Sequence, residues 1–343
     1  MSLISYLHRI AGHHNLSCAE ALDAMEIVLG GNASAVEIAA FLVALRMKGE
    51  TVPELVGFAR AMRRMAAPVD PGLAGQPLLD TCGTGGDGSS TFNISTVAAF
   101  VVAGAGVHVA KHGNRSISSR CGSADLLETF GIELAIPPEQ SARAIREIGI
   151  GFLFAPAVHT AMRHAQPVRR ELRMRTVFNL LGPLTNPAGA TAQLVGAPSP
   201  EAAELMAGAL AALGLERGFV VHGSDGLDEI TTTGPTLAFE IRAGEVERRI
   251  LEPAAFGVAL ASPGDLKGGD KQRNHDIARA VLEGTPGPPR DIVLVNAAAA
   301  LVAVGFVCDF LEGVRAAAAS IDSGAALGKA GELARFTKSL SAA

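Results

Sequence analysis

Hydrophobic residues in the first 67 positions recur at helical spacing, and polar residues interrupt them at regular intervals. Ile38, Phe41, Leu42 and Leu45 illustrate this spacing, which places one apolar face along a helix. Three pairs combine a hydroxyl side chain with a glutamate three positions later, which is typical of a capping box at a helix start: Ser17 with Glu20, Ser34 with Glu37, and Thr51 with Glu54. We predict a small helical bundle that is too short to hold an active site alone.

Beyond Pro68, Pro71 and Gly72 the pattern changes to short apolar runs that alternate with helical stretches. The predicted strands are 78–79, 107–110, 152–154, 193–195 and 219–221. The helical stretches between them lie near 95–104, 122–130, 139–147 and 201–213. Such alternation predicts an α/β domain with a central, mostly parallel sheet. Residues 237–250 are predicted to add an antiparallel hairpin that turns at Ala243-Gly244.

The longest apolar run extends from Ile292 to Cys308 and contains Asn296, Gly305 and many alanines. It is barely long enough to span a bilayer, so we interpret it as a buried helix. Histidines and an arginine stand within the apolar pattern of the N-terminus, which argues against a secretory signal. We therefore expect a soluble, cytoplasmic protein with no membrane partner.

Composition narrows the function classes. Hydrophobic residues make up 48% of the chain and charged residues 18%, which excludes a disordered protein. The formal net charge of −5 gives no overall attraction to nucleic acid, and a 4% aromatic content leaves few side chains for base stacking. The four cysteines are far apart and form no CxxC pair, so we expect free thiols in a reducing compartment and no zinc site: Cys18, Cys82, Cys121 and Cys308.

The most informative stretch is 80–96, where a predicted strand leads into a glycine-rich loop and a helix follows. Glycines at 83, 85, 86 and 88 let backbone N–H groups approach an anion closely, and the helix N-terminus adds its positive end. Asn93, Ser95 and Thr96 supply polar side chains. We predict a cradle for phosphate or pyrophosphate. The alternative, a flexible turn, leaves these polar side chains unexplained.

Two related templates do not apply to this loop. Gly83, Gly85 and Gly88 match GxGxxG, but the dinucleotide fingerprint also requires an acid about 20 residues further on. No Asp or Glu lies between Asp87 and Asp125. The Gly-Lys-Ser/Thr ending of a Walker loop is also missing.

A second candidate stretch, Lys111-His-Gly-Asn-Arg115, follows the next predicted strand, where open α/β sheets bind ligands. Its cations suit a polyanion, with Lys as a point charge and Arg as a fork. A solvated basic turn is the alternative. The segment 121–125 opens a further helix whose N–H groups could bind an anion. We expect this basic turn and the glycine loop to face one diphosphate ligand.

Asp228 and Glu229 are adjacent carboxylates in a loop after another predicted strand. They can face one point only with a cation, and their hard oxygens suit Mg²⁺ that is shared with substrate phosphates. A solvated acidic turn fits the sequence equally well. The basic segment 163–175, which includes Arg169, could be a nucleic-acid patch, a solvated helix face or the grip on a substrate carboxylate.

Together these motifs resemble the anthranilate phosphoribosyltransferase family of tryptophan biosynthesis over nearly the whole chain. The segments that carry the resemblance are 83–87, 93–96, 111–115, 121–125, 175–187 and 226–230. The family transfers the phosphoribosyl group of phosphoribosyl pyrophosphate (PRPP) to the amine of anthranilate, which yields N-(5-phosphoribosyl)anthranilate and pyrophosphate. This chain departs from the family at Lys271-Gln-Arg-Asn274, where an acidic stretch is common.

The resemblance implies an architecture of the nucleoside phosphorylase/phosphoribosyltransferase type. Residues 1–69 would form a small helical domain, joined by helices near 167–186, and the rest of 70–343 would form the α/β domain. The small domain would make a homodimer. No nucleic acid is expected as a partner.

The resemblance also implies the site residues. The substrate-binding set is Gly83, Gly86, Asp87, Ser90, Thr91, Asn93, Ser95, Thr96, Lys111, His112, Asn114, Ser123, His159, Arg169, Gly182 and Pro183. Within it, 83–87 would hold the pyrophosphate and ribose end, Ser123 the 5′-phosphate, and Arg169 the anthranilate carboxylate. Two Mg²⁺ ions per subunit are implied, one on Ser95 and one on Asp228 and Glu229. The amine of anthranilate is neutral at pH 7, so we expect catalysis by positioning and Mg²⁺, without a covalent intermediate.

Two other functions compete with this interpretation. A pyrimidine nucleoside phosphorylase shares the architecture, but its glycine loop and its Lys-x-Ser-x-x-Arg pattern differ from 83–87 and 111–115. A non-catalytic nucleic-acid binder would use 163–175, but it would have no use for the Asp228–Glu229 pair.

Overall fold

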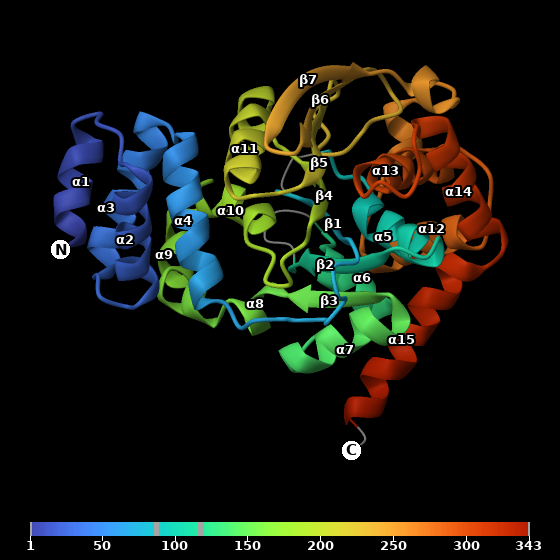
Figure 1. Cartoon of the computed structure of the whole chain (residues 1–343), viewed down its shortest axis with the longest axis horizontal. Helices are drawn as coiled ribbons and strands as arrows, with labels where there is room; N and C mark the ends of the chain where they lie inside the picture. The colour runs from blue at the N-terminus through green and yellow to red at the C-terminus, as the bar shows by residue number, and fades with distance from the viewer. Residues whose placement is uncertain (1, 86–88, 116–119, 342–343) are drawn as a thin grey trace.

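Figure 1 shows the computed structural model, in which a small helical lobe stands beside a larger lobe built around a sheet. The structure describes residues 2–85, 89–115 and 120–341. The helical lobe begins with four helices: α1 (Leu3–Ala11), α2 (Cys18–Leu29), α3 (Ala35–Lys48) and α4 (Val52–Met65).

The starts of α2, α3 and α4 confirm the three predicted capping boxes. At the first of them, Ser17 Oγ accepts the Glu20 N–H at 3.3 Å and the Glu20 carboxylate accepts the Ser17 N–H at 2.9 Å. Losing such a cap costs about 1 kcal/mol. The apolar faces of the helices enclose a core in which the Phe41 and Phe58 rings meet edge to face with centroids 6.2 Å apart.

The larger lobe contains one seven-stranded sheet in the order β3-β2-β1-β4-β5-β6-β7. Its strands are β1 (Leu78–Gly83), β2 (His108–Gly113), β3 (Ile150–Phe154), β4 (Ala192–Gly196), β5 (Arg217–Gly223), β6 (Thr236–Arg242) and β7 (Glu245–Leu251). The first five run parallel, and β6 and β7 add antiparallel partners. All five predicted strands and the hairpin are confirmed. Ala243 and Gly244 have φ of +51° and +86°, as a two-residue type I′ turn requires.

Helices cover both faces of this sheet. The helices that follow β1 in the chain are α5 (Ile94–Gly104), α6 (Ser123–Thr129), α7 (Pro138–Ile148), α8 (Ala155–Val158), α9 (Gln166–Leu172), α10 (Phe178–Leu184), α11 (Pro200–Ala212), α12 (Lys271–Leu282), α13 (Pro288–Ala303), α14 (Phe310–Asp322) and α15 (Ala325–Ser341). Of these, α9 and α10 belong to the helical lobe. Alternate strand residues face opposite layers: Leu194 packs with α5 and α13, whereas Val195 packs with α11. This alternation determines which residues of β4 face each helical layer.

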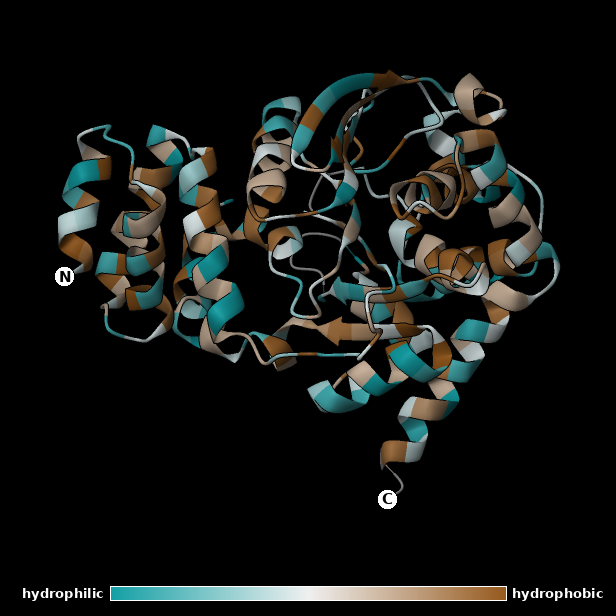
Figure 2. Cartoon of the chain, in the orientation of Figure 1, coloured by the Kyte–Doolittle hydropathy of each residue, from teal (hydrophilic) through white to brown (hydrophobic). Residues whose placement is uncertain are grey.

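The apolar run at Ile292–Cys308 forms the buried helix that the sequence predicts, but α13 ends at Ala303. The chain turns there, and Gly305 takes a φ of +76°. Figure 2 shows apolar residues concentrated on the helices that cross the middle of the larger lobe. Within the described residues, none of the helices is both long and apolar enough to span a bilayer.

The segment 166–184 returns to the helical lobe although it follows the third strand of the sheet. Here α9 contacts α3 and α10 contacts α4. Val168, Phe178 and Leu181 belong to the same apolar core as the first four helices. The return places these residues beside the carboxyl ends of the parallel strands.

Strand order creates a switch point between β1 and β4. After β1 the chain crosses to β2 on one side, whereas β4 pairs with β1 on the other side. In open α/β sheets such a point leaves a crevice outside the carboxyl ends of the two strands, where ligands bind. The strands finish there in two glycines, Gly83 and Gly196, which pair in register.

Candidate active site

The Asp228–Glu229 loop lies directly on the two glycines that end β1 and β4. A Cβ at Gly83 would lie 2.5 Å from Asp228 Oδ2, and a Cβ at Gly196 would lie 1.6 Å from the Asp228 carbonyl oxygen. Neither approach leaves room for a side chain. Asp228 Oδ2 also accepts the Gly85 N–H at 2.8 Å, so the acidic loop and the glycine loop are in contact.

Glu229 faces the first turn of α5. Its Oε1 accepts the Ser95 N–H at 3.1 Å, where the positive end of the helix favours an anion. Ser95, Asp228 and Glu229, which the resemblance proposes as metal ligands, are therefore gathered at one end of the sheet. Among the described residues, no cluster of three or more His, Cys, Asp or Glu could hold a metal. The hard oxygens present fit Mg²⁺, which commonly takes its remaining ligands from substrate phosphates and water.

Lys111 lies beneath these groups and is buried. Its Nζ donates to the Thr81 carbonyl at 2.5 Å and lies 3.4 Å from Ser95 Oγ. Burial lowers the pKa of Lys111, and the attraction of Asp80 opposes that shift. Asp80 is itself fully buried, which raises the pKa of its carboxyl group. Attraction between the two charges offsets part of the cost of burying them.

Asp80 has further partners that sequence reasoning missed. Its carboxylate accepts the His112 N–H at 3.1 Å and the Asn186 side-chain amide at 2.8 Å. A charged residue inside a predicted buried strand is the signal that could have identified it.

The start of α12 supports the glycine loop. Asn274 Nδ2 donates to Asn93 Oδ1 at 3.0 Å, and Asn274 Oδ1 accepts the Gly269 N–H at 2.7 Å. Asn93 in turn donates to the Cys121 carbonyl at 3.1 Å. The segment in which this chain departs from the family pattern thus fixes one of the predicted cradle residues.

Two more predicted residues touch the segment before α12. The Ser90 carbonyl accepts the Gly268 N–H at 2.9 Å, and Thr91 forms an isolated antiparallel bridge with Lys267. Gly86 and Asp87 lie outside the described residues.

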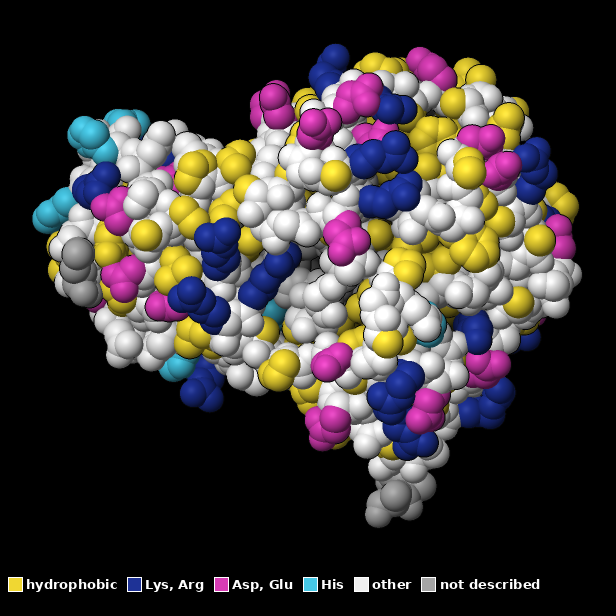
Figure 3. All heavy atoms as spheres, viewed as in Figure 1, with side chains coloured by type: hydrophobic (Ala, Val, Ile, Leu, Met, Phe, Trp, Pro, Cys, Tyr) yellow, Lys and Arg dark blue, Asp and Glu magenta, His cyan; other side chains and the backbone are white. Residues whose placement is uncertain are grey.

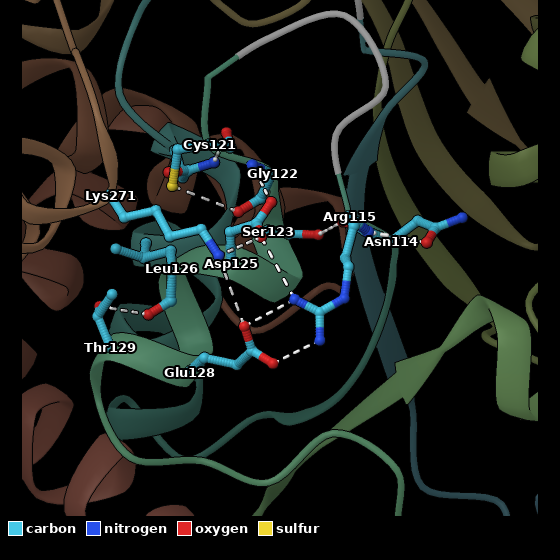
Figure 4. A network of polar contacts seen from close by, with 11 residues as sticks. Asn114, Arg115, Cys121, Gly122, Ser123, Asp125, Leu126, Glu128, Thr129 and Lys271 are labelled. Atoms are coloured by element: carbon cyan, nitrogen blue, oxygen red, sulfur yellow. Dashed lines mark hydrogen bonds and ion pairs between the residues drawn. The ribbon is translucent and has the colours of Figure 1, made fainter.

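Asn114 and Ser123 lie together, as Figure 4 shows. The Asn114 carbonyl accepts the Ser123 hydroxyl at 3.2 Å and the Ala124 N–H at 3.3 Å. The basic turn therefore joins the N-terminus of α6, which keeps both predicted phosphoribosyl contacts on one side of the sheet.

Arg115 is directed to carboxylates on α6. Its Nη1 and Nη2 donate to the two Glu128 oxygens at 2.7 and 2.5 Å. Lys271 Nζ contacts Asp125 Oδ1 at 2.8 Å and completes the network of Figure 4. The Arg115 guanidinium group, which was predicted to bind a polyanion, pairs with Glu128 in this structure. This pairing lowers the pKa of the Glu128 carboxyl group.

His112 and His159 form a buried pair with ring centroids 5.1 Å apart. His112 Nδ1 lies 3.2 Å from the Gly182 carbonyl oxygen. Burial lowers the pKa of His112 to about 4 and that of His159 to about 3, so both rings are neutral at pH 7. Neither Nε2 has a hydrogen-bond partner in the part of the chain that the structure describes. Two neutral imidazoles are thus available to a polar group.

Gly182 and Pro183 border this pair. A Cβ at Gly182 would meet nothing within 4 Å, so open space lies in front of it. The Pro183 carbonyl accepts the Gln193 side-chain amide at 2.9 Å. This contact fixes α10 to β4 beside the histidines.

Arg169 extends from α9 over the Phe178 ring, with its guanidinium carbon 5.2 Å from the ring centroid. Burial lowers the pKa of Arg169, and across the described ranges it makes no ion pair with a carboxylate. Figure 3 shows Lys and Arg side chains grouped beside the hollow between the two lobes. Arg175, further along, donates to the Gly85 carbonyl at 2.6 Å and links the returning segment to the glycine loop.

Thr96 is a predicted site residue in an enclosed position, with 1% of its surface exposed. It is buried in α5, and its hydroxyl has no partner among the described atoms. The hydroxyls of Thr84 and Thr176 are buried in the same way. These two residues flank Gly85 and Arg175 and lie within the segments 83–87 and 175–187, but neither is named in the predicted substrate-binding set.

Comparisons with known proteins agree on one family. A profile described as "Glycosyl transferase family, a/b domain" matches residues 75–327, and one described as "Glycosyl transferase family, helical bundle domain" matches residues 4–66. The anthranilate phosphoribosyltransferase of Solibacter usitatus (strain Ellin6076) is 73% identical over 339 residues, which are 99% of this chain and 100% of that relative.

Solved structures give the same result. The crystal structure of anthranilate phosphoribosyltransferase from Thermus thermophilus has a TM-score of 0.92 and 44% identity, and covers 98% of this chain and 100% of that one. The Saccharomyces cerevisiae anthranilate phosphoribosyltransferase in complex with PRPP and Mg has a TM-score of 0.90 and 29% identity, and covers 98% of both chains.

Proposed function

This chain belongs to the anthranilate phosphoribosyltransferase family, and we propose that the crevice at the ends of β1, β2 and β4 binds PRPP with Mg²⁺. The enzyme transfers the phosphoribosyl group of PRPP to the amine of anthranilate and releases pyrophosphate, the second step of tryptophan synthesis from chorismate. The observation that carries the site is the meeting of Asp228, Glu229 and Ser95 above the Gly83–Gly196 pair.

In this proposal each residue of the site either neutralises charge on PRPP or holds PRPP in position. Gly83, Gly86 and Asp87 hold the pyrophosphate and ribose end, with the N-terminus of α5 directed at the same anion. Lys111 and Asn114 contact the phosphoribosyl group, and Ser123 its 5′-phosphate. The remaining contacts are assigned to Ser90, Thr91, Asn93, Ser95 and Thr96.

Ser95 would hold one Mg²⁺, and Asp228 with Glu229 a second. Bound Mg²⁺ would neutralise charge that develops on the departing pyrophosphate. The chain itself fixes the distance between the anomeric carbon and the amine. Since the attacking amine is already neutral, neither His112 nor His159 is required as a base, in accord with their lowered pKa values.

A fluorescence assay tests the function directly. Anthranilate fluorescence should fall when the protein is mixed with PRPP and Mg²⁺, and should stay constant when EDTA is added or PRPP is left out. Constant fluorescence in the complete mixture would refute the assignment.

We assign the anthranilate carboxylate to Arg169, with His112, His159, Gly182 and Pro183 along its route. Arg169→Ala should raise the KM for anthranilate by roughly 10- to 100-fold, because a hydrogen bond to a charged group contributes about 1.5–3 kcal/mol. The KM for PRPP should change little. Steady-state kinetics with each substrate varied in turn would measure both values.

The exposed neighbour Arg170 provides the control on the same helix. Arg170→Ala should leave the KM for anthranilate close to that of the wild type. Equal increases in both KM values for Arg169→Ala would assign that side chain to another role.

We also propose a homodimer formed through the helical domain, which comprises residues 1–69 and the helices near 167–186. Val36 and Met47 on α3 are 78% and 76% exposed, and positions eleven apart share a face of an α-helix. Exposed apolar side chains on one face are typical of an interaction surface. The free cysteines fit the cytoplasm as the place of action.

Placing two lysines on this face should separate the subunits. Val36→Lys combined with Met47→Lys should halve the mass measured by analytical ultracentrifugation, because two like charges would meet their copies across the interface. Ile250→Lys, at a 52% exposed position on β7, is the matched control and should keep the wild-type mass. A wild-type mass for the double variant would exclude this face.

A further inference from the structure

Asn296 is a fully buried asparagine within α13, the most continuously buried helix of the larger lobe. An amide in such surroundings is costly unless its polar atoms are hydrogen-bonded. Its Oδ1 accepts the Ile230 N–H at 3.0 Å, and its Nδ2 donates to the Ile230 carbonyl at 2.9 Å. Nδ2 also donates to the Ile292 carbonyl at 2.9 Å. One side chain therefore holds both backbone groups of a single loop residue.

That loop residue directly follows Glu229. A two-point grip on the backbone of Ile230 restrains the orientation of its peptide groups, and so the position of the Glu229 Cα next to it. Glu229 accepts the Ser95 N–H from α5, and α13 packs against α5. The same helix thus supports both sides of the Glu229–Ser95 contact.

Apart from Asp228, which contacts the glycine loop and the ends of β1 and β4, part of the loop is held by local contacts. Asp225 Oδ2 accepts the hydroxyls of Thr231 and Thr233, each at 2.6 Å, and Oδ1 accepts the Leu227 N–H at 3.2 Å. These bonds join the loop to itself and do not tie it to the helices. Asn296 supplies hydrogen bonds that tie the loop to a helix, α13.

We infer that Asn296 is a positioning residue that holds Glu229 and Asp228 where they can share a divalent cation with the substrate diphosphate. The inference rests on the proposed function of the Asp228–Glu229 pair. An amide that only stabilised the core would give the same hydrogen bonds, so the test must separate metal-dependent binding from stability.

The test compares Asn296→Ala with Ser320→Ala. Ser320 is also buried in a helix of the same lobe, and its hydroxyl donates to the Val101 carbonyl at 2.7 Å, away from the acidic loop. PRPP binding is measured by isothermal titration calorimetry over a series of Mg²⁺ concentrations without anthranilate, so no turnover occurs. Urea unfolding of each protein measures stability.

We expect Asn296→Ala to raise the Mg²⁺ concentration needed for half-maximal PRPP binding by about 10- to 100-fold, as is common when the support of a metal ligand is removed. The KM for anthranilate should remain within about twofold of wild type, because the Arg169 side of the site is untouched. Ser320→Ala should lower stability without moving the Mg²⁺ dependence.

Two results would decide otherwise. An Mg²⁺ dependence equal to that of wild type and of Ser320→Ala would overturn the positioning role and leave Asn296 as a core residue. If Asn296→Ala does not fold, Asn296→Ser, which removes less volume, gives the comparison. Wild-type protein that binds PRPP without any Mg²⁺ dependence would instead refute the proposed function of the metal pair.

Discussion

Asp228→Asn combined with Glu229→Gln should lower the Mg²⁺-dependent turnover by about 100- to 1000-fold, the loss that follows removal of a group stabilising transition-state charge. The two substitutions keep the size of each side chain and remove both negative charges. The remaining amide oxygen at each position could still accept the N–H group that Asp228 or Glu229 accepts, from Gly85 and Ser95 respectively, so the loop should keep its place. Turnover is measured by anthranilate fluorescence over a series of Mg²⁺ concentrations.

The control for this double variant removes two charges elsewhere. Glu245→Gln combined with Glu247→Gln alters the same number of carboxylates on the exposed strand β7, and should leave turnover at the wild-type level. Circular dichroism would confirm that both proteins are folded. Unchanged turnover in the Asp228/Glu229 variant would remove the metal role from this loop.

Local patterns explain why much of the fold follows from the sequence. The capping boxes at Ser17 and Ser34 depend on residues three positions apart, so the sequence itself contains the whole interaction. The parallel strands are short apolar runs, and the hairpin turn depends on Ala243 and Gly244 alone. Strand order is different, because it depends on which runs pair in space, and no local pattern predicted that β4 lies beside β1.

The same distinction applies to the site. The glycine loop and the basic turn are continuous segments, and their proximity follows from adjacent strands. Asn274 and Asn296 are single residues far along the chain, and each acts through hydrogen bonds to a residue distant in sequence, Asn93 for the first and Ile230 for the second. Asn296 was visible only as a polar residue in an apolar run. The burial that makes His112 and His159 neutral depends on packing between lobes, which the sequence pattern does not contain.

Gly196→Ala tests the tighter of the two approaches of Asp228 to the strand ends. The φ of Gly196 does not lie in the left-handed region, so alanine suits the backbone and the effect would arise from contact alone. Its Cβ would lie 1.6 Å from the Asp228 carbonyl oxygen and 2.4 Å from the carbonyl carbon, both backbone atoms that cannot rotate away. The loop must therefore move off the sheet. Forced overpacking of this kind costs about 1–3 kcal/mol of stability.

Displacement of the loop carries Asp228 and Glu229 with it, so Gly196→Ala should lose PRPP binding as well as turnover. We expect turnover to fall by about 100-fold or more, since Glu229 leaves its position beside Ser95 and Asp228 leaves its position beside Gly85. Gly328→Ala is the matched control, because a Cβ there meets nothing within 4 Å on α15. It should keep full activity and gain up to about 1 kcal/mol of stability from higher helix propensity.

Calorimetric PRPP titration measures the effect of Gly196→Ala on binding, and urea unfolding measures its effect on stability. Normal PRPP binding by folded Gly196→Ala would mean that the acidic loop does not depend on contact with β4, and the close packing of Asp228 on the strand ends would then have no part in forming the site.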